Sequence, residues 1–139
     1  MIKLNFLSAL IFIVCIFLCQ IDADAKMREK DYVNMYCTGK KEYMLPDKTR
    51  VDCLTEEYAV EFDFAKKWAE SIGQCLYYSK MTGKKPAAAI IITKPSDMKY
   101  IKRIQTADEN IHIFIIPACK KHCPAKLYDK FGVRKFSIL

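Results

Sequence analysis

Short stretches of alternating or continuous apolar residues recur along the chain after residue 25. Stretches of this kind predict β-strands when they are rich in aromatic and β-branched side chains and bounded by turn-forming residues. We predict strands at residues 42–45, 50–54, 59–64, 87–93 and 111–116. Residues 87–93 have the sequence AAAIIIT, which is apolar throughout. We therefore expect this strand in the centre of a sheet that is covered on both faces.

Helical periodicity separates the later strands. Apolar residues at offsets of three, four, seven and eleven form one helical face, namely Ala65, Trp68, Ala69, Ile72 and Leu76. Gly83 ends this helix, and we expect its apolar face to pack on the sheet. Shorter helices are predicted at 26–37 and 96–106. The order α-β-β-β-α-β-α-β predicts a single-domain α/β sandwich with a mixed central sheet, which begins antiparallel and continues with strand–helix–strand crossovers.

Residues 1–25 differ in character from the rest of the chain. An apolar run over 4–18 is followed by the sequence DADA at 22–25. This order is typical of a secretory signal peptide with an Ala-x-Ala cleavage site. The alternative is an uncleaved membrane anchor, because the apolar stretch is almost long enough to span a bilayer. We expect an exported protein, periplasmic or secreted, that touches a membrane only through an uncleaved N-terminal segment.

The chain is strongly basic. Its net charge is +7 over 139 residues, and removal of residues 1–25 raises the net charge to +8. A basic surface favours polyanions such as nucleic acid, anionic lipid or an acidic envelope polymer. The alternative is that the lysines serve only to keep the protein dispersed. We place the domain at 26–118 and a basic tail with little periodicity at 119–139.

Five of the seven cysteines follow residue 25. Disulfides are the default in an exported protein, and an odd number leaves one thiol unpaired. Cys53 is expected on the core-facing side of the hairpin, and Cys37 ends the helix that should cover this side. We therefore predict a disulfide between Cys37 and Cys53, which would raise the free energy of unfolding by about 3 kcal/mol. Two buried free thiols are the alternative. The segment CKKHC at 119–123 offers zinc only three ligands, which favours a disulfide or simple packing there.

Acidic residues face one another across the predicted hairpin at 50–64. If Leu54 faces Ala59, Asp52 lies opposite Glu61 and Arg50 lies opposite Asp63, all on one face of the sheet. The opposite face then carries Val51, Cys53, Val60, Phe62 and Phe64. Like charges directly opposite one another destabilise a sheet, and a hard cation such as Mg²⁺ would relieve the repulsion. The alternative is a solvated hairpin with an Arg50–Asp63 ion pair.

A polar stripe lies on the helix that follows. Lys67, Gln74 and Tyr78 are separated by seven and four residues, so they lie along one side of the helix. The position of Lys67 directly after the strand brings its side chain close to the acidic pair. Lys66 lies off the stripe, where it can pair with Glu70 at the next turn. A plain solvent-exposed face is the alternative interpretation of the stripe.

These residues resemble a known family. Asp52, then Glu61-x-Asp63, then Gln74-x-x-x-Tyr78 resemble the restriction-endonuclease-like (PD-D/ExK) nuclease superfamily, and the helix resembles its RecB-like branch in particular. The order α-β-β-β-α-β is also the core of that superfamily, so the resemblance covers about residues 26–116. The sequences YMLPDKTRVDCLT and EFDFAKKWAESIGQCLYY are similar to small exported bacterial proteins of unassigned function.

The resemblance implies a Mg²⁺ site. Asp52 and Glu61 would hold the ion, with the backbone carbonyl of Phe62 as a third ligand and Glu42 as an additional acid. The metal would polarise the scissile phosphate and help to ionise the attacking water.

The family's lysine lies two residues after the second acid, where this chain has Asp63. Lys67 is the candidate substitute, with Lys66 second, and it would orient the water and stabilise the developing charge. Gln74 and Tyr78 would support the site or contact the DNA backbone.

Three functions remain open. The first is an exported Mg²⁺-dependent phosphodiesterase that cleaves DNA. The second is a non-catalytic module on the same fold that binds nucleic acid or the cell envelope, which the displaced lysine favours. The third is a small toxin or immunity-like protein, for which basic charge serves association with a protein partner.

Overall fold

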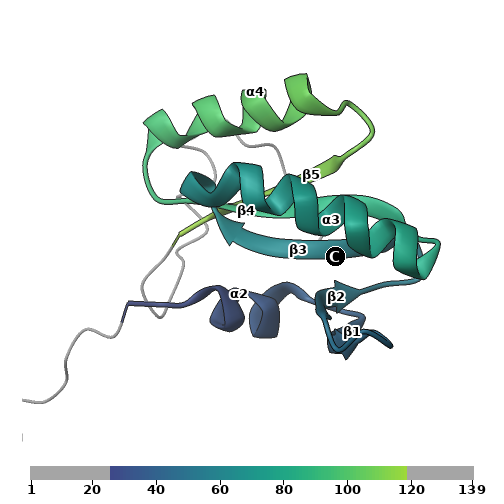
Figure 1. Cartoon of the computed structure of the whole chain (residues 1–139). Coiled ribbons are helices and arrows are strands. Elements are labelled where there is room, and N and C mark those ends of the chain that lie inside the picture. The colour runs from purple at the N-terminus through teal and green to yellow at the C-terminus, as the bar shows by residue number, and fades with distance from the viewer. Residues whose placement is uncertain (1–25, 119–139) are drawn as a thin grey trace, which may run out of the picture.

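The computed structural model describes residues 26–118 (Figure 1). The predicted signal segment and the predicted basic tail, with its CKKHC sequence, lie outside the described residues. Within 26–118, no helix combines the length and the apolarity that a membrane crossing requires.

The order of elements is the predicted one. They are α2 (Glu29–Tyr36), β1 (Lys40–Met44), β2 (Arg50–Leu54), β3 (Tyr58–Phe64), η1 (Ala65–Lys67), α3 (Trp68–Thr82), β4 (Lys85–Ile92), η2 (Pro95–Asp97), α4 (Met98–Ala107) and β5 (His112–Pro117). The two later helices each begin with a 3₁₀ turn, which is common at helix N-termini. Gly83 ends α3 in the left-handed conformation at φ 69°, as the sequence predicts.

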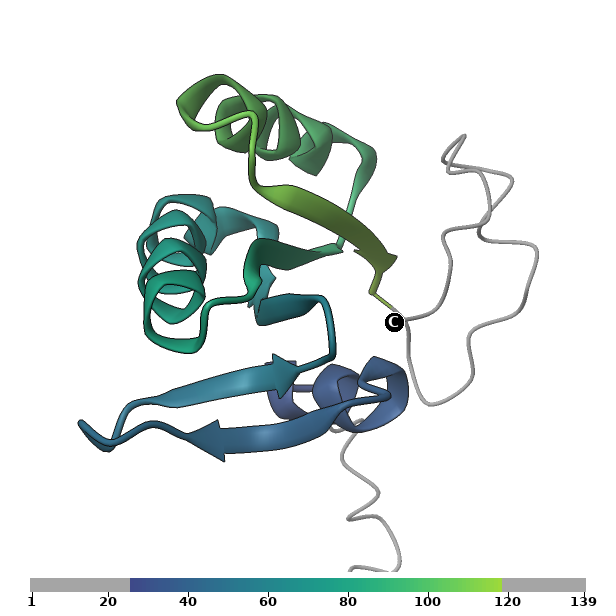
Figure 2. The same ribbon diagram turned by 90° about the vertical axis from the view of Figure 1, so that its right-hand side faces the viewer.

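The five strands form one mixed sheet in the order β1-β2-β3-β4-β5. The first three strands run antiparallel, and β3, β4 and β5 run parallel. The α/β class and the mixed sheet are therefore confirmed. Helix α2 lies on one side of the sheet and helices α3 and α4 lie on the other (Figures 1 and 2). Strand β4 lies inside the sheet between β3 and β5 and is buried from Ala87 to Ile92, as expected for a strand covered on both faces.

Each face of the sheet has its own core. Ala87, Ala89 and Ile91 of β4 pack with Tyr32 and Val33 of α2. The alternating positions of β4 pack against α3 and α4 in a second cluster, which contains Ala88, Ile90, Ile92, Ile101 and Ile104. Alternation along a strand thus supplies both layers from one apolar run.

The predicted apolar face of α3 is only partly correct. Leu76 is 36% exposed, and the buried side chains of the helix are Ser71, Cys75 and Tyr78. Trp68 and Ile72 pack in the cluster that includes α4. The helix is rotated from the predicted orientation because the polar Ser71 hydrogen-bonds to the sheet residue Asp63, so the most buried stripe is not the most apolar one.

The predicted distribution of the hairpin residues also needs one correction. Cys53, Val60 and Phe62 pack on the α2 side as expected, but Val51 packs with Leu45, Ala59 and Tyr78. The register Cys53↔Val60 and Leu54↔Ala59 is the predicted one, and these are the paired positions of β2 and β3. The first residues of β2 pair with β1 but not with β3, so Val51 does not follow the alternation of β3.

Two features tie α2 and the start of β1 to β2. The predicted disulfide between Cys37 and Cys53 is present, with a Cα–Cα distance of 5.7 Å, while Cys75 is a buried free thiol. A Cβ at Gly39 would lie 2.2 Å from the carbonyl oxygen of Leu54, so only glycine allows this close approach. The disulfide is compatible with an exported protein.

Candidate functional site

A cleft of about 450 Å³ lies beside α3 and the β1–β2 hairpin, and α2 contributes to its lining. All seven predicted site residues line it, namely Glu42, Asp52, Glu61, Asp63, Lys67, Gln74 and Tyr78. Lys66 is exposed and is not part of the lining. The structure thus brings together the residues of the hairpin and the polar stripe of the helix.

Glu61 is the most unusual of these side chains. It projects from the central part of β3, is only 6% exposed, and its Oε2 has no hydrogen-bond partner among residues 26–118. Burial, together with repulsion from Asp52 and Asp63, raises the pKa of Glu61 to about 9. Leaving a buried carboxyl oxygen unpaired costs free energy. The position therefore suits a ligand that can bind this oxygen.

Asp52 comes from the neighbouring strand. Its Oδ2 accepts a hydrogen bond from the backbone N–H of Phe62 at 2.9 Å. Despite this bond, burial raises the pKa of Asp52 to about 6, with repulsion from Glu42 and Glu29 as a smaller contribution. The pairing of β2 with β3 ends at Cys53↔Val60, so the predicted strand pair of Asp52 with Glu61 is not formed, but the charge of Asp52 still contributes to the raised pKa of Glu61. The two carboxyls are held near one another at a cost in electrostatic free energy.

Glu42 has a strained backbone. Its φ of 51° lies in the left-handed region, which costs a residue with a side chain on the order of 1 kcal/mol. Its carboxylate pairs with Arg50 at 3.2 Å. The alternative Arg50–Asp63 pair is not formed among the described residues, because Arg50 turns to β1 instead. Strain of this kind is common at functional sites.

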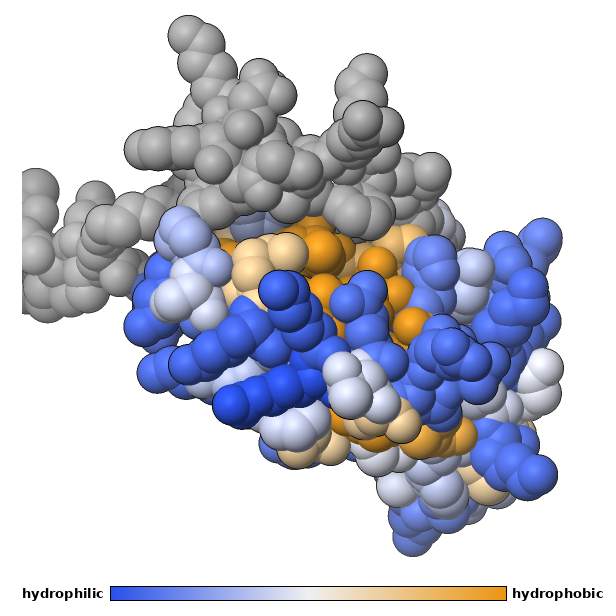
Figure 3. Space-filling model, turned by 90° about the horizontal axis from the view of Figure 1, so that it is seen from above, coloured by the Kyte–Doolittle hydropathy of each residue, from blue (hydrophilic) through white to orange (hydrophobic). Residues whose placement is uncertain are grey.

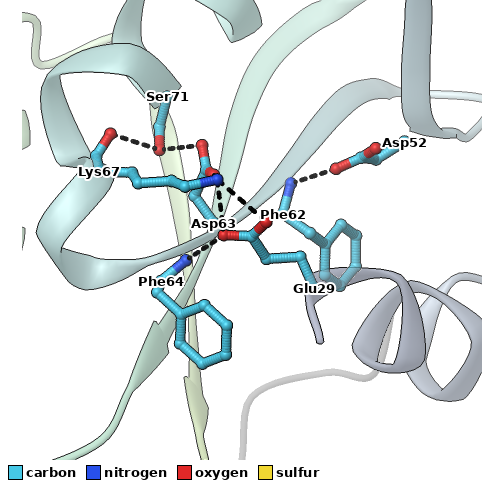
Figure 4. A network of polar contacts seen from close by, with 7 residues as sticks. All are labelled: Glu29, Asp52, Phe62, Asp63, Phe64, Lys67 and Ser71. Carbon is cyan, nitrogen blue, oxygen red and sulfur yellow. Dashed lines mark hydrogen bonds and ion pairs between the residues drawn. The ribbon is translucent and has the colours of Figure 1, made fainter. Parts of the chain in front are cut away.

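A network of charges surrounds Asp63 (Figure 4). The Nζ of Lys67 lies 3.5 Å from Asp63 Oδ1 and 3.0 Å from Glu29 Oε1, and the hydroxyl of Ser71 donates to Asp63 Oδ2 at 2.7 Å. Burial raises the pKa of Asp63 to about 6. The bond to Glu29 raises the pKa of Lys67. The lysine ammonium is therefore held beside Asp63.

Sequence reasoning missed Glu29. This residue comes from α2, and its carboxylate binds both Lys67 and the backbone N–H of Phe64, the latter at 3.3 Å. An acid in the first turn of a helix is common, because it interacts favourably with the helix dipole. No local signal distinguishes Glu29 from such a residue. Only the packing of α2 against β3 shows its second role.

The remaining predicted residues lie on the helix side of the cleft. Tyr78 is 6% exposed, and burial raises its pKa. The amide oxygen of Gln74 is buried without a partner among residues 26–118, like the oxygen of Glu61. The predicted Lys66–Glu70 ion pair is not formed within this part of the chain, and Glu70 lines the cleft instead.

The acidic side chains of the cleft can be compared with the ligands that a hard cation requires. Within the described residues, no three His, Cys, Asp or Glu side chains are arranged as a metal-binding group. Mg²⁺, however, is commonly held by one or two carboxylates, with waters and substrate phosphates as the other ligands. Asp52 and Glu61 are two carboxyls that line the same cleft, and the Oε2 of Glu61 has no hydrogen-bond partner among residues 26–118.

Comparison with known proteins gives no relative: no family model, no curated protein and no solved structure matches this chain significantly.

Proposed function

We propose that this protein is an exported, Mg²⁺-dependent phosphodiesterase that cleaves DNA on a restriction-endonuclease-like fold. The observation that carries the proposal is the buried, unpaired oxygen of Glu61, in one cleft with Asp52 and Lys67. Two carboxyls and a cation in one cleft support the proposal, because the carboxyls could hold a metal ion that acts on a phosphodiester.

The fold and the disulfide add support. The order of elements from α2 to β4 is α-β-β-β-α-β, which is the core that the family resemblance implies. The Cys37–Cys53 disulfide and the predicted signal segment agree with an oxidising compartment outside the cytosol.

Asp52 and Glu61 would hold Mg²⁺, and the backbone carbonyl of Phe62 and the carboxylate of Glu42 are further oxygen donors. The bound metal would polarise the phosphate and acidify water.

Lys67 stabilises the negative charge that develops at the phosphate. Its raised pKa keeps it protonated at neutral pH, so it supplies charge and not a base. Asp63 and Glu29 position its ammonium. Gln74 and Tyr78 of α3 also line the cleft, where they can orient the substrate.

A non-catalytic nucleic-acid-binding module is the second candidate. Two observations favour it: the charge of Lys67 is already matched by two carboxylates, and Asp63 stands where the resemblance would place a lysine.

The test is cleavage of plasmid and linear duplex DNA with Mg²⁺ or EDTA. Glu61→Gln and Asp52→Asn should each abolish Mg²⁺-dependent cleavage. Glu57→Gln is the matched control, because Glu57 is an exposed acid that pairs with Lys85 and does not line the cleft. Cleavage that survives Glu61→Gln would refute the proposed site. Salt-sensitive DNA binding without cleavage would favour the module, and a specific protein partner without any DNA effect would favour a toxin or immunity-like role.

A further inference from the structure

The outer face of α4 carries unpaired cations. Lys99, Lys102 and Arg103 recur at spacings of three and four residues, so they share one side of the helix. Ile101 and Ile104 lie on the opposite side and are buried against the sheet. The three cations are exposed, and within residues 26–118 none of them forms an ion pair with a carboxylate. We call these three residues, together with Lys66 of η1, the α4 basic face.

Aromatic rings hold this face in place without neutralising it. The guanidinium of Arg103 lies 5.4 Å from the ring centroid of Trp68 and 5.3 Å from that of Tyr100. The ammonium of Lys99 lies 5.0 Å from the ring of Tyr100. Cation–π contacts orient a positive charge but leave it available to an anion. The cations are thus partly preorganised for an anionic partner.

The cleft itself offers a polyanion little attraction. Six acidic side chains line the cleft, against four basic ones. Two of the basic side chains, Arg50 and Lys67, form ion pairs with acids. Such a cleft repels a polyanion unless attraction is supplied from elsewhere. Helix α4 packs beside η1, where Lys66 is exposed and the adjacent Lys67 lines the cleft. Seen from above, the surface shows many hydrophilic residues in blue around a group of hydrophobic residues in orange (Figure 3).

We propose that the α4 basic face binds the phosphate backbone of duplex nucleic acid and holds it next to the cleft. This proposal deepens the proposed function, on which its choice of partner rests. Nucleic acid is favoured over a membrane because a membrane-bound amphipathic helix inserts its apolar side into the bilayer. The apolar side of α4 is covered by the sheet, and none of the exposed large hydrophobic residues belongs to α4.

The test measures binding in EDTA, where metal-dependent cleavage cannot contribute. Trp68 is the only tryptophan of the chain and lies under Arg103, so its fluorescence reports on the α4 basic face. Random-sequence duplex DNA should change the emission of Trp68 in the purified protein, with an affinity that falls steeply with salt.

The variant K99A/K102A/R103A should reduce the slope of log affinity against log salt by about one for each lost phosphate contact. The matched control is K40A/K41A/K80A, which removes the same charge from exposed lysines elsewhere and should retain most of the slope. Equal losses in both variants, or an unchanged slope in the α4 variant, would overturn the proposal. So would a response of Trp68 to anionic vesicles without one to DNA. If the wild type binds DNA through the α4 basic face but does not cleave it with Mg²⁺, the proposed function is refuted and the present inference stands.

Discussion

Lys67 and Lys66 are adjacent lysines in η1 with different surroundings. The ammonium of Lys67 is fixed by Glu29 and Asp63 at the cleft, whereas Lys66 is exposed and outside the cleft. The ion pairs of Lys67 are partly exposed, so their contribution to stability is small. The difference between the two lysines is therefore expected in activity and not in folding.

We predict that Lys67→Ala abolishes Mg²⁺-dependent cleavage and leaves the unfolding free energy within about 1 kcal/mol of the wild type. Lys66→Ala should retain cleavage at saturating DNA. The measurements are initial cleavage rates at saturating DNA and urea unfolding followed by circular dichroism. Equal rates for wild type and Lys67→Ala would remove this lysine from the mechanism and leave the non-catalytic module as the better explanation.

At the level of elements, α2 is attached to the sheet at both ends. Glu29 at its start binds Phe64 and Lys67, and Cys37 at its end is bonded to Cys53. The disulfide therefore stabilises the domain and also helps to hold a site residue in place.

We predict that Cys37→Ala/Cys53→Ala lowers the unfolding free energy by about 3 kcal/mol, because the unfolded chain regains the entropy of a closed loop. Urea unfolding with and without a reducing agent measures the effect. The reductant should lower the stability of the wild type and leave that of the double variant unchanged. A free Cys37 in non-reducing peptide maps of the exported protein would contradict the pairing.

Two glycines provide a matched test of the close approach between the start of β1 and β2. An added methyl at Gly39 would clash with the carbonyl of Leu54, while one at Gly73, on an exposed turn of α3, would meet nothing within 4 Å. We predict that Gly39→Ala destabilises the domain by about 1–3 kcal/mol and that Gly73→Ala stabilises it by up to about 1 kcal/mol. Thermal unfolding would decide, and a neutral Gly39→Ala would show that β1 can shift away from β2.

The elements could be predicted because their signals are local. The apolar run of β4 and the glycine that ends α3 each depend on neighbours in sequence, and the register of Leu54 with Ala59 follows from one short loop. The orientation of α3 could not be predicted, because it depends on the bond between Ser71 and Asp63. Glu29 was missed for the same reason: its contacts lie 35 and 38 residues away in sequence.

For the whole molecule, the buried acids predict an unusual pH dependence. Burial raises the pKa of Glu61 to about 9 and the pKa values of Asp52 and Asp63 to about 6. Below about pH 4 these carboxyls are protonated in both the folded and the unfolded states, and their contribution to stability is fully present. As the pH rises, the unfolded chain loses these protons first. Stability is therefore lost progressively until the pH passes the folded pKa values.

We predict that the unfolding free energy falls between about pH 5 and about pH 8, and that Glu61→Gln flattens this fall because it removes the group with the largest shift. Adding Mg²⁺ at about pH 8 should raise the stability of the wild type by mass action and leave Glu61→Gln unchanged. Urea titrations over this pH range provide the measurement. A wild-type stability that rises with pH, or equal Mg²⁺ effects on both proteins, would contradict the assignment.

The limited pairing of β2 with β3 divides the sheet into the β1–β2 hairpin and the parallel strands β3 to β5. Glu42 and Asp52 lie on the hairpin, and Glu61 lies on the parallel part. The two parts are joined by the register pairs near Leu54 and by the bond of the Asp52 carboxylate to the N–H of Phe62. The same hairpin is also fixed by the Cys37–Cys53 disulfide and by the packing of Val51 with Ala59 and Tyr78. A change in the width of the cleft therefore requires the hairpin to move against these contacts.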